Sequence, residues 1–440
     1  MFINRKLGEY VLLRRLAVGG QSEVFLAVKE GPDDFTRPLV IKALPTEYRH
    51  DPTFVELFYR EAFLSARFSH PNVITVHDAK RLRGDHCMIM DYLAGKTVAE
   101  FAQRAHRRGE PLTLEMAIQI VADACAGLHY THRFRDLDQT RYSVVHRDVS
   151  PQNLMVTYQG LTKVFDFGIA KIQEEDGGEE TLAGGKYAYM SPEQCREERV
   201  DARSDIFSLG VILYELTVGR RLFRRDSTEE TIAAVTGGDI PTPTSVNPNF
   251  PRALEPIVMR ALERDPKDRY QSAERLRDDL IETLGARFDG KLRRRVGAHC
   301  AELFAEERAD IARTLNRARE ENLDPRPVGD IPLEKLGRED VSVDEAEPEV
   351  PMPEPERDKD LAAQLDEKSA GSNIDPQSIK TAKEKNERLA AEVTRLQRRQ
   401  TLLVAVLLAM ALAAAGFAFY SNSAPSEDEG EPIEIGDTSE

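Results

Sequence analysis

The chain has 440 residues, which is enough for about two or three domains. Its 76 acidic residues outnumber its 60 basic ones and give a formal net charge of -16, which argues against a nucleic-acid partner. The four cysteines, at positions 87, 125, 195 and 300, are too widely spaced for a zinc or redox motif, so we expect buried thiols in a reducing cytosol.

Residues 8–286 are dense in apolar side chains, and the period of these side chains changes along the chain. Alternating patterns predict strands at residues 10–16 and 23–29, around a pair of glycines, and at residues 39–44. After Thr113 the spacing becomes helical, as in Met116, Ile120, Ala124 and Leu128. A strand-rich start and a helix-rich remainder predict an α+β fold with two lobes.

Several segments carry the groups that phosphoryl transfer requires. His146-Arg-Asp148 is followed by Asn153 and then by Val164-Phe-Asp-Phe-Gly168, while Leu39-Val-Ile-Lys42 and Glu61 lie upstream. Phosphoryl transfer depends mainly on positioning and on neutralisation of charge. In this order the segments resemble the protein kinase signature, and the resemblance covers about residues 8–284.

The resemblance implies a two-lobed fold, with an antiparallel sheet and one helix in the N-lobe and mostly helices in the C-lobe. It implies that Asp148 orients the attacking hydroxyl and that Asp166 and Asn153 bind Mg²⁺ through hard oxygen ligands. Lys42 would hold the α- and β-phosphates of ATP, and Glu61 would hold Lys42.

The expected phosphate-covering loop departs from the full glycine pattern, because Ala17 and Ser22 replace the first and third glycines. Gly19 remains at the centre, where the backbone must approach phosphate most closely. Met90 resembles the gatekeeper, and backbone groups of Asp91 and Leu93 would bond the adenine edge. The residues expected to contact ATP are Leu16, Ala17, Val18, Gly19, Gly20, Gln21, Ser22, Glu23, Val24, Val40, Lys42, Met90, Asp91 and Leu93.

Two further motifs of the same resemblance have structural roles. Ser191-Pro-Glu193 resembles the motif that closes the activation segment, and Glu193 is expected to pair with Arg269. Asp205 matches the aspartate that braces the catalytic loop. Both motifs argue for the complete fold rather than for the chemistry.

Ser150 stands where serine/threonine kinases usually have lysine, and Lys186 stands where they usually have threonine. One hypothesis is an exchange, in which Lys186 supplies the cation and Ser150 the hydroxyl. The alternative is simple drift with a slower enzyme. We predict a serine/threonine kinase, with a nucleotide-binding pseudokinase scaffold as the alternative function.

Activation is predicted to involve Arg147 and Thr181. In kinases with an arginine before the catalytic aspartate, that arginine commonly docks a phosphate of the activation segment. Thr181 is the only serine or threonine between Asp166 and Met190, so we expect it to be autophosphorylated.

Five segments are expected after the kinase domain of residues 8–286. Residues 287–320 form a charged helical extension, either solvated or partner-binding, and we favour a solvated helix. Residues 321–375 are acidic and rich in proline, and predict a disordered linker. Residues 376–400 predict a juxtamembrane helix or a short coiled coil, in which residues 379–396 could form a homodimer.

Residues 401–420 contain no charge and predict a single transmembrane helix. Arg395, Arg398 and Arg399 precede it, whereas the acidic tail 421–440 has no Lys or Arg, so the kinase domain is expected in the cytoplasm and the tail outside. The resemblance is to bacterial, eukaryotic-like kinases, which implies the inner membrane. A ligand-sensing receptor is disfavoured because about twenty acidic residues cannot fold around a ligand.

Overall fold

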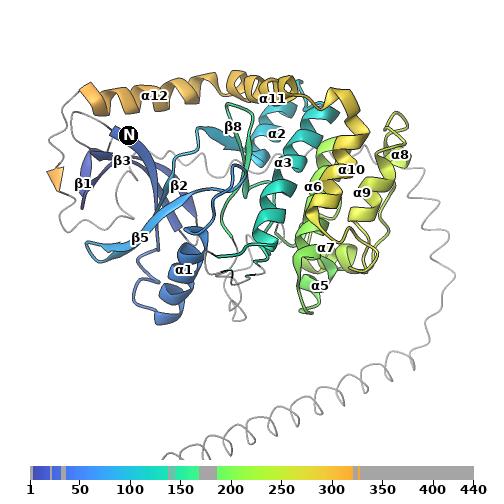
Figure 1. The fold of residues 1–440 in the computed structure, drawn as a ribbon, viewed down its shortest axis with the longest axis horizontal. Helices are drawn as coiled ribbons and strands as arrows, with labels where there is room; N and C mark the ends of the chain where they lie inside the picture. Colours follow the sequence, from blue (N-terminus) through green and yellow to red (C-terminus); the bar gives the residue numbers. More distant parts are fainter. Residues whose placement is uncertain are drawn as a thin grey trace, which may run out of the picture. The chain divides into compact units, whose positions relative to one another are not determined.

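The computed structural model describes residues 3–19, 22–30, 36–136, 139, 142, 144–167, 186–320 and 326–327 (Figure 1). They all belong to one compact unit, residues 1–354. Most of the predicted linker, the juxtamembrane helix, residues 401–420 and the tail lie outside the described residues. Within the residues that are described, no helix combines the length and the apolar character needed to cross a membrane.

The first lobe is built on a twisted sheet whose described strands run in the order β10-β1-β2-β3-β4-β6-β5. Every neighbouring pair is antiparallel except β1 with β10. The predicted strands at residues 10–16, 23–29 and 39–44 are confirmed. The strands are β1 (Arg5–Leu7), β2 (Tyr10–Gly19), β3 (Ser22–Glu30), β4 (Thr36–Ala43), β5 (Val76–Leu82), β6 (Asp85–Asp91) and β10 (Arg326–Pro327).

Helix α1 (Pro52–Ser65) packs on one face of this sheet and carries Glu61. The helix begins where Asp51 accepts hydrogen bonds from the backbone N–H groups of Thr53 and Phe54, and proline occupies its first turn. Phe58 and Ala62 are buried against the sheet. Their burial fixes the rotation of the helix and so aims Glu61 inward.

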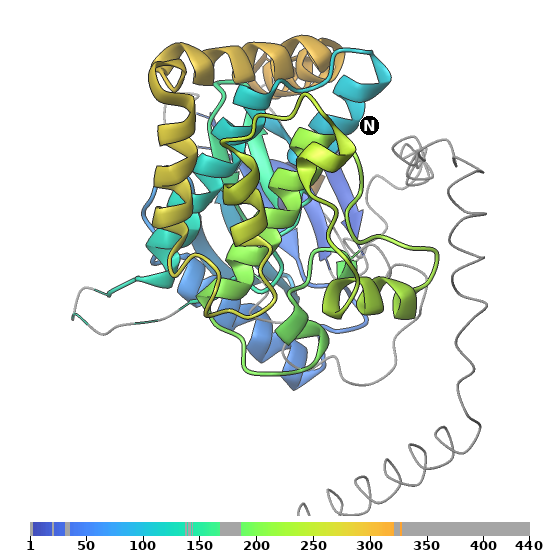
Figure 2. The ribbon, with the colours of Figure 1, turned by 90° about the vertical axis from the view of Figure 1, so that its right-hand side faces the viewer.

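The second lobe is mostly helical, with α3 (Leu114–His132) at its centre (Figure 2). Helix α3 begins directly after Thr113, where the apolar spacing becomes helical. The Thr113 side chain caps the helix by accepting from the Met116 amide. A small antiparallel sheet joins β7 (Gly95–Thr97), β8 (Leu154–Thr157) and β9 (Thr162–Val164). The other helices are α2 (Val98–Arg107), α5 (Pro192–Cys195), α6 (Ala202–Val218), α7 (Thr228–Thr236), α8 (Pro243–Val246), α9 (Glu255–Ala261) and α10 (Ala273–Leu284), and a 3₁₀ turn, Gly285–Arg287, follows.

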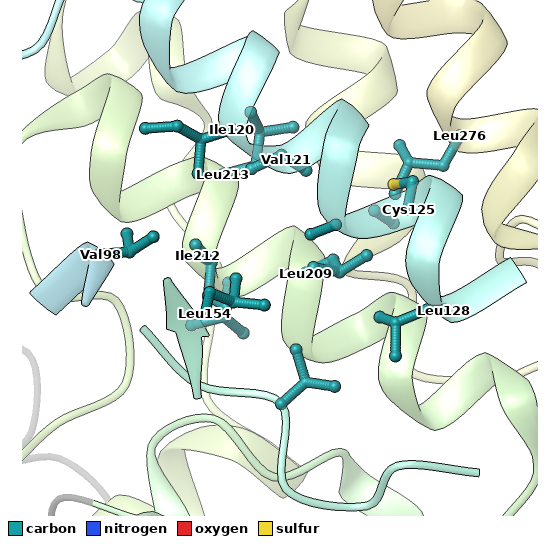
Figure 3. Close-up of a cluster of buried hydrophobic side chains, with 14 of the residues drawn as sticks. Val98, Ile120, Val121, Cys125, Leu128, Leu154, Leu209, Ile212, Leu213 and Leu276 are labelled. Atoms are coloured by element: carbon teal, nitrogen blue, oxygen red, sulfur yellow. The ribbon is translucent and has the colours of Figure 1, made fainter. Parts of the chain in front are cut away.

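The core of this lobe forms where α3 and α6 cross (Figure 3). Ile120, Leu128 and Leu213 are fully buried there, together with the thiol of Cys125. Cys87 and Cys300 are likewise buried free thiols, and Cys195 is a half-buried one. The lobe is therefore a rigid platform, from one edge of which the catalytic loop emerges.

Two helices, α11 (Gly290–Leu303) and α12 (Ala305–Glu320), follow the 3₁₀ turn, and we call residues 290–320 the C-terminal extension. The favoured interpretation of a solvated helix is wrong. Leu292, Val296 and Cys300 of α11 are fully buried in the core of the second lobe. On α12, Ala318 is buried against the sheet of the first lobe. Each helix thus packs an apolar face on the body of the protein, and Arg293 and Asp310 add ion pairs to these contacts.

Candidate active site

Three charged side chains from three separate elements meet at the centre of the site. The Lys42 ammonium of β4 lies 2.8 Å from Asp166 Oδ1 and 3.5 Å from Glu61 Oε1 of α1. Burial alone would lower the pKa of Lys42, but the two carboxylates outweigh it and raise the pKa above its usual value. Lys42 therefore stays charged over the whole physiological pH range and presents a fixed cation.

The catalytic loop brings Asp148 and Asn153 together. Asn153 Nδ2 donates to the backbone oxygen of Asp148 at 2.8 Å and to its carboxylate at 2.7 Å. Because Nδ2 is used in this way, Oδ1 is the atom of Asn153 that could bind a metal. The Asp166 carboxylate, which is about 40% exposed, is the second oxygen donor of the predicted magnesium pair.

Asp205 of α6 holds the backbone of the catalytic loop through hydrogen bonds. Its carboxylate accepts from the amides of His146 and Arg147, at 2.8 and 2.9 Å, and from His132 Nε2 at 2.7 Å. Burial would raise the pKa of Asp205, but the hydrogen bond and the charge of His132, aided by His146, outweigh it and lower the pKa. The predicted bracing contact is confirmed.

Two residues of the site have backbone angles that non-glycine residues rarely adopt. Arg147 has φ of +64° and Asp166 has φ of +54°. Such conformations cost about 1–3 kcal/mol each and persist only where the surroundings impose them. His146 links the two segments, because its Nε2 donates to the backbone oxygen of Phe165 at 3.0 Å and its Nδ1 accepts from the Asp148 amide at 3.2 Å.

The predicted nucleotide loop is the end of the β2–β3 hairpin. Leu16 lies at an irregularity of the pairing and is 38% exposed, which is unusual for a large apolar side chain. The Glu23 carboxylate is buried against Arg15, so we expect only the backbone of Glu23 to face a nucleotide. Gly20 and Gln21 lie outside the described residues. Near the end of the hairpin, the antiparallel register places Ala17 opposite Val24, Val18 opposite Glu23 and Gly19 opposite Ser22.

The predicted adenine-contacting residues gather in one apolar cluster. Val40 and Met90 are opposite one another on β4 and β6, and Val24 and Leu93 pack on the same cluster. The Asp91 amide donates to the Thr75 carbonyl at 3.0 Å. In any backbone hydrogen bond with an adenine, the carbonyl oxygen of Asp91 is therefore expected to accept.

The remaining predicted residues are only partly placed. Ser150 is half-buried in the catalytic loop, and its carbonyl accepts from the Asn153 amide at 3.0 Å. Lys186 is helical, as is Tyr187, and the residues before it lie outside the described part of the chain. Thr181, the predicted phosphorylation site, lies outside the described residues. Of Arg147, its predicted partner, the backbone carbonyl accepts from Gln194 Nε2 at 2.8 Å.

The segment that closes the site is fixed by a buried ion pair. Arg269 donates through both terminal nitrogens to Glu193, each at 2.7 Å, and Ser204 donates to the same carboxylate at 2.6 Å. Burial would raise the pKa of Glu193, but Arg269 and Ser204 lower it below its usual value. The predicted pairing of Glu193 with Arg269 is confirmed.

A family description, protein kinase domain, matches residues 10–281. The chain belongs to the protein kinase family. Among the curated relatives of this kinase, a tyrosine-protein kinase of Myxococcus xanthus, MasK, is 39% identical over 302 residues, covering 68% of the chain and 47% of the relative. The serine/threonine-protein kinase PknB of Mycolicibacterium smegmatis is 34% identical over 279 residues, covering 62% of the chain and 42% of the relative.

The kinase thus spans about half the length of the curated relatives it matches. Among solved structures, the kinase domain of Mycobacterium tuberculosis PknI is 25% identical, with a TM-score of 0.49, and covers 65% of this chain and all of that one.

Two residues around the site of this kinase were not predicted from its sequence. Asp123 of α3 is buried and accepts from the Thr162 amide at 3.1 Å and from Arg293 of α11 at 2.8 Å. Tyr92, two residues after Met90, packs on two apolar clusters at once. An acid inside an apolar helical pattern was the available signal for Asp123, whereas the sequence carried none for the packing of Tyr92.

Proposed function

We propose that the chain is an ATP- and Mg²⁺-dependent protein kinase that phosphorylates serine and threonine side chains of proteins. The observation that carries the proposal is the meeting of Lys42, Glu61 and Asp166, while His146 ties the loop of Asp148 to the segment of Asp166 through the Phe165 carbonyl. Transfer of a phosphoryl group needs a fixed cation, hard oxygen ligands and a carboxylate beside the nucleophile. A chain selected only for nucleotide binding would not need Asp148.

Each residue has a role that its position supports. Lys42, held by Glu61, binds the phosphates of ATP, and the apolar cluster of Val24, Val40 and Met90 receives the adenine. The oxygen donors of Asp166 and Asn153 fit Mg²⁺, which neutralises phosphate charge when bound. Asp148 accepts a hydrogen bond from the substrate hydroxyl and orients it in line with the phosphoryl group.

The class of hydroxyl is the finer part of the proposal. Relatives named as serine/threonine kinases support serine and threonine, whereas MasK, at 39% identity, is named a tyrosine kinase. Ser150 leaves this question to experiment, because the lysine that usually marks serine/threonine kinases is missing there. The exchange of roles between Ser150 and Lys186 remains part of the proposal.

The test is a transfer assay with γ-labelled ATP, Mg²⁺ and a mixture of serine, threonine and tyrosine peptides. The full chain is compared with Asp148→Asn, which keeps the size of the side chain but removes the acceptor charge. We expect label on serine and threonine, and a rate at least about 10²-fold lower in the variant. Nucleotide binding without transfer would instead favour a pseudokinase scaffold, and label on tyrosine alone would reverse the assigned substrate class.

We also propose that residues 401–420 hold the kinase at a membrane, with the kinase domain on the cytoplasmic side. Twenty uncharged residues after three arginines support this topology. The protein should remain in the membrane fraction after washing at high pH. A reporter that fluoresces only in the cytoplasm should stay dark when fused after Glu440. Recovery of the kinase in the soluble fraction would contradict the tether.

Autophosphorylation of Thr181 is the regulatory part of the proposal. A phosphate there could dock on Arg147, as a charge-assisted hydrogen bond orders a segment. Mass spectrometry of the purified kinase should find the phosphate, and Thr181→Ala should reduce activity. An active enzyme with Thr181 unmodified would exclude this mechanism.

A further inference from the structure

The C-terminal extension belongs to both lobes at once. Helix α11 packs into the core of the second lobe, and α12 packs on the sheet of the first (Figure 1). Only Phe304 separates the two helices, and its side chain is itself buried. A movement of one lobe relative to the other must therefore displace α12 or bend the chain at this residue.

Helix α11 is the fixed end of the extension. Arg293 donates to the buried Asp123 of α3 at 2.8 Å. A Cβ atom at Gly297 would lie 2.5 Å from the backbone nitrogen of Gly160, so α11 contacts the β8–β9 turn backbone to backbone. The helix cannot shift without breaking the core of its own lobe.

Helix α12 contacts the first lobe through one apolar stripe. Ile311, Leu315 and Ala318 recur at helical spacing and pack on one face of the sheet. That face is formed by Val11, Leu13, Leu26 and Val28. An ion pair between Arg14 of β2 and Asp310 of α12 adds to the contact.

The face of the sheet that α12 covers continues along β3 toward the predicted nucleotide loop. Side chains two and four residues apart on a strand point to the same side. Leu26 and Val28 therefore lie on the same face of β3 as Val24, which packs beside Val40 and Met90. Helix α12 holds the base of the hairpin whose tip is expected to cover the phosphates.

The extension also reaches the connection between the lobes. Tyr92 packs on the cluster of Ile311 and Leu315, and it packs on the cluster that contains Met90 as well. On the other side of the connection, Glu307 of α12 accepts from Arg104 of α2 at 2.8 Å. Packed side chains thus run continuously from α12 to the predicted adenine site.

We propose that α12 is a positioning element for ATP, in which Ile311 and Leu315 hold the first lobe in the orientation that brings Lys42 to Glu61 and Asp166. The proposal rests on the proposed function, since it assumes that ATP binds at this site. Docking of α12 and binding of ATP then favour the same arrangement of the lobes. By linkage each must strengthen the other.

The decisive variant carries Ile311→Asp and Leu315→Asp in the full chain, purified in detergent. Its matched control carries Ala309→Asp and Ala312→Asp, which add the same charge to the exposed side of the same helix. Binding of a non-hydrolysable ATP analogue with Mg²⁺ is measured by calorimetry. We expect about tenfold weaker binding in the decisive variant, equivalent to about 1.4 kcal/mol, and less than a twofold change in the control.

Kinetics separate positioning from general damage. Undocking lowers the fraction of molecules that are competent to bind, and this lowers the apparent affinity by the same factor. Saturating ATP restores the docked state, so KM for ATP should rise about tenfold while kcat changes less than threefold. In the wild type, adding the analogue should slow amide hydrogen exchange in residues 305–320.

A charge reversal tests the same contact without disturbing apolar packing. Arg14→Asp and Asp310→Arg should each weaken analogue binding about two- to fivefold, the range of a surface ion pair. The double variant should return to within twofold of the wild type. This pair decides the question if the Ile311 and Leu315 variant does not fold.

Several outcomes would overturn the proposal. One is wild-type analogue affinity in the folded decisive variant. Another is α12 amide exchange that does not respond to nucleotide, and a third is a double charge reversal that does not restore binding. If the wild type binds the analogue with these dependences but transfers no phosphate, the proposed function fails while the role of α12 stands.

Discussion

Replacing Gly297 with alanine tests how closely α11 packs on the turn between β8 and β9. The added Cβ would meet three backbone atoms, namely the Gly160 nitrogen at 2.5 Å, the Gln159 carbonyl carbon at 2.6 Å and the Tyr158 oxygen at 2.6 Å. Ordinary contact begins at 3.4 Å, so α11 would have to move by about 0.9 Å, the difference between 3.4 and 2.5 Å. Backbone atoms cannot rotate away as side chains do.

Two effects of the change have opposite signs. Alanine is favoured over glycine inside a helix by about 1 kcal/mol. Overpacking of a close-packed site costs about 1–3 kcal/mol, and a clash with backbone belongs to the upper part of that range. We therefore expect Gly297→Ala to lower the free energy of unfolding by about 1–2 kcal/mol.

Gly290→Ala is the matched control, because it lies at the start of the same helix and a Cβ there meets nothing within 4 Å. Urea unfolding followed by circular dichroism should show the control at or slightly above wild-type stability and Gly297→Ala below it. A Gly297→Ala protein as stable as the control would refute the close approach of α11 to the turn.

Three further results are expected. Glu193→Gln should destabilise the kinase by about 3 kcal/mol in urea unfolding, because it leaves Arg269 buried without its counter-charge; a loss under 1 kcal/mol would contradict this. The pKa values of Glu193 and Asp205 are lowered in the folded protein, so the stabilisation from these carboxylates is complete above their ordinary pKa values of 4.5 and 3.8 and is lost as the pH falls below those values. Urea midpoints should therefore drop in this acidic range, and they should drop less steeply in Glu193→Gln. Lys186→Met should lower kcat about 10²–10³-fold if Lys186 supplies the missing cation, and Ser150→Lys with Lys186→Thr should recover much of it; unchanged turnover in Lys186→Met would exclude the exchange.

The charged groups of the site could be predicted from sequence because their chemistry restricts residue type. Lys42 and Asp166 are 124 residues apart, yet few side chains can hold a phosphate or a metal at those positions. The pairing of Glu193 with Arg269 was predicted from the resemblance of Ser191-Pro-Glu193 to a kinase motif, and the burial of Arg269 gives its physical reason.

The docking of the extension was not predictable in this way. Leu292 and Val296 recur at helical spacing, but the run of arginines between them is equally compatible with a solvated helix. An apolar stripe shows that a helix has a partner and does not say which surface the partner offers. The position of Ile311 on the other lobe depends on the turn at Phe304, which has no distinctive sequence.

The buried face of α11 also changes what counts as one folding unit. The family match ends at residue 281, yet Leu292, Val296 and Cys300 are fully buried beyond it. Burying a large aliphatic side chain completely stabilises a protein by about 1.5–3 kcal/mol, which is a large part of the net stability of a domain. A fragment cut at the family boundary would expose a long apolar surface on the second lobe and invite aggregation. The smallest fragment expected to fold cooperatively therefore extends through α11 to Phe304.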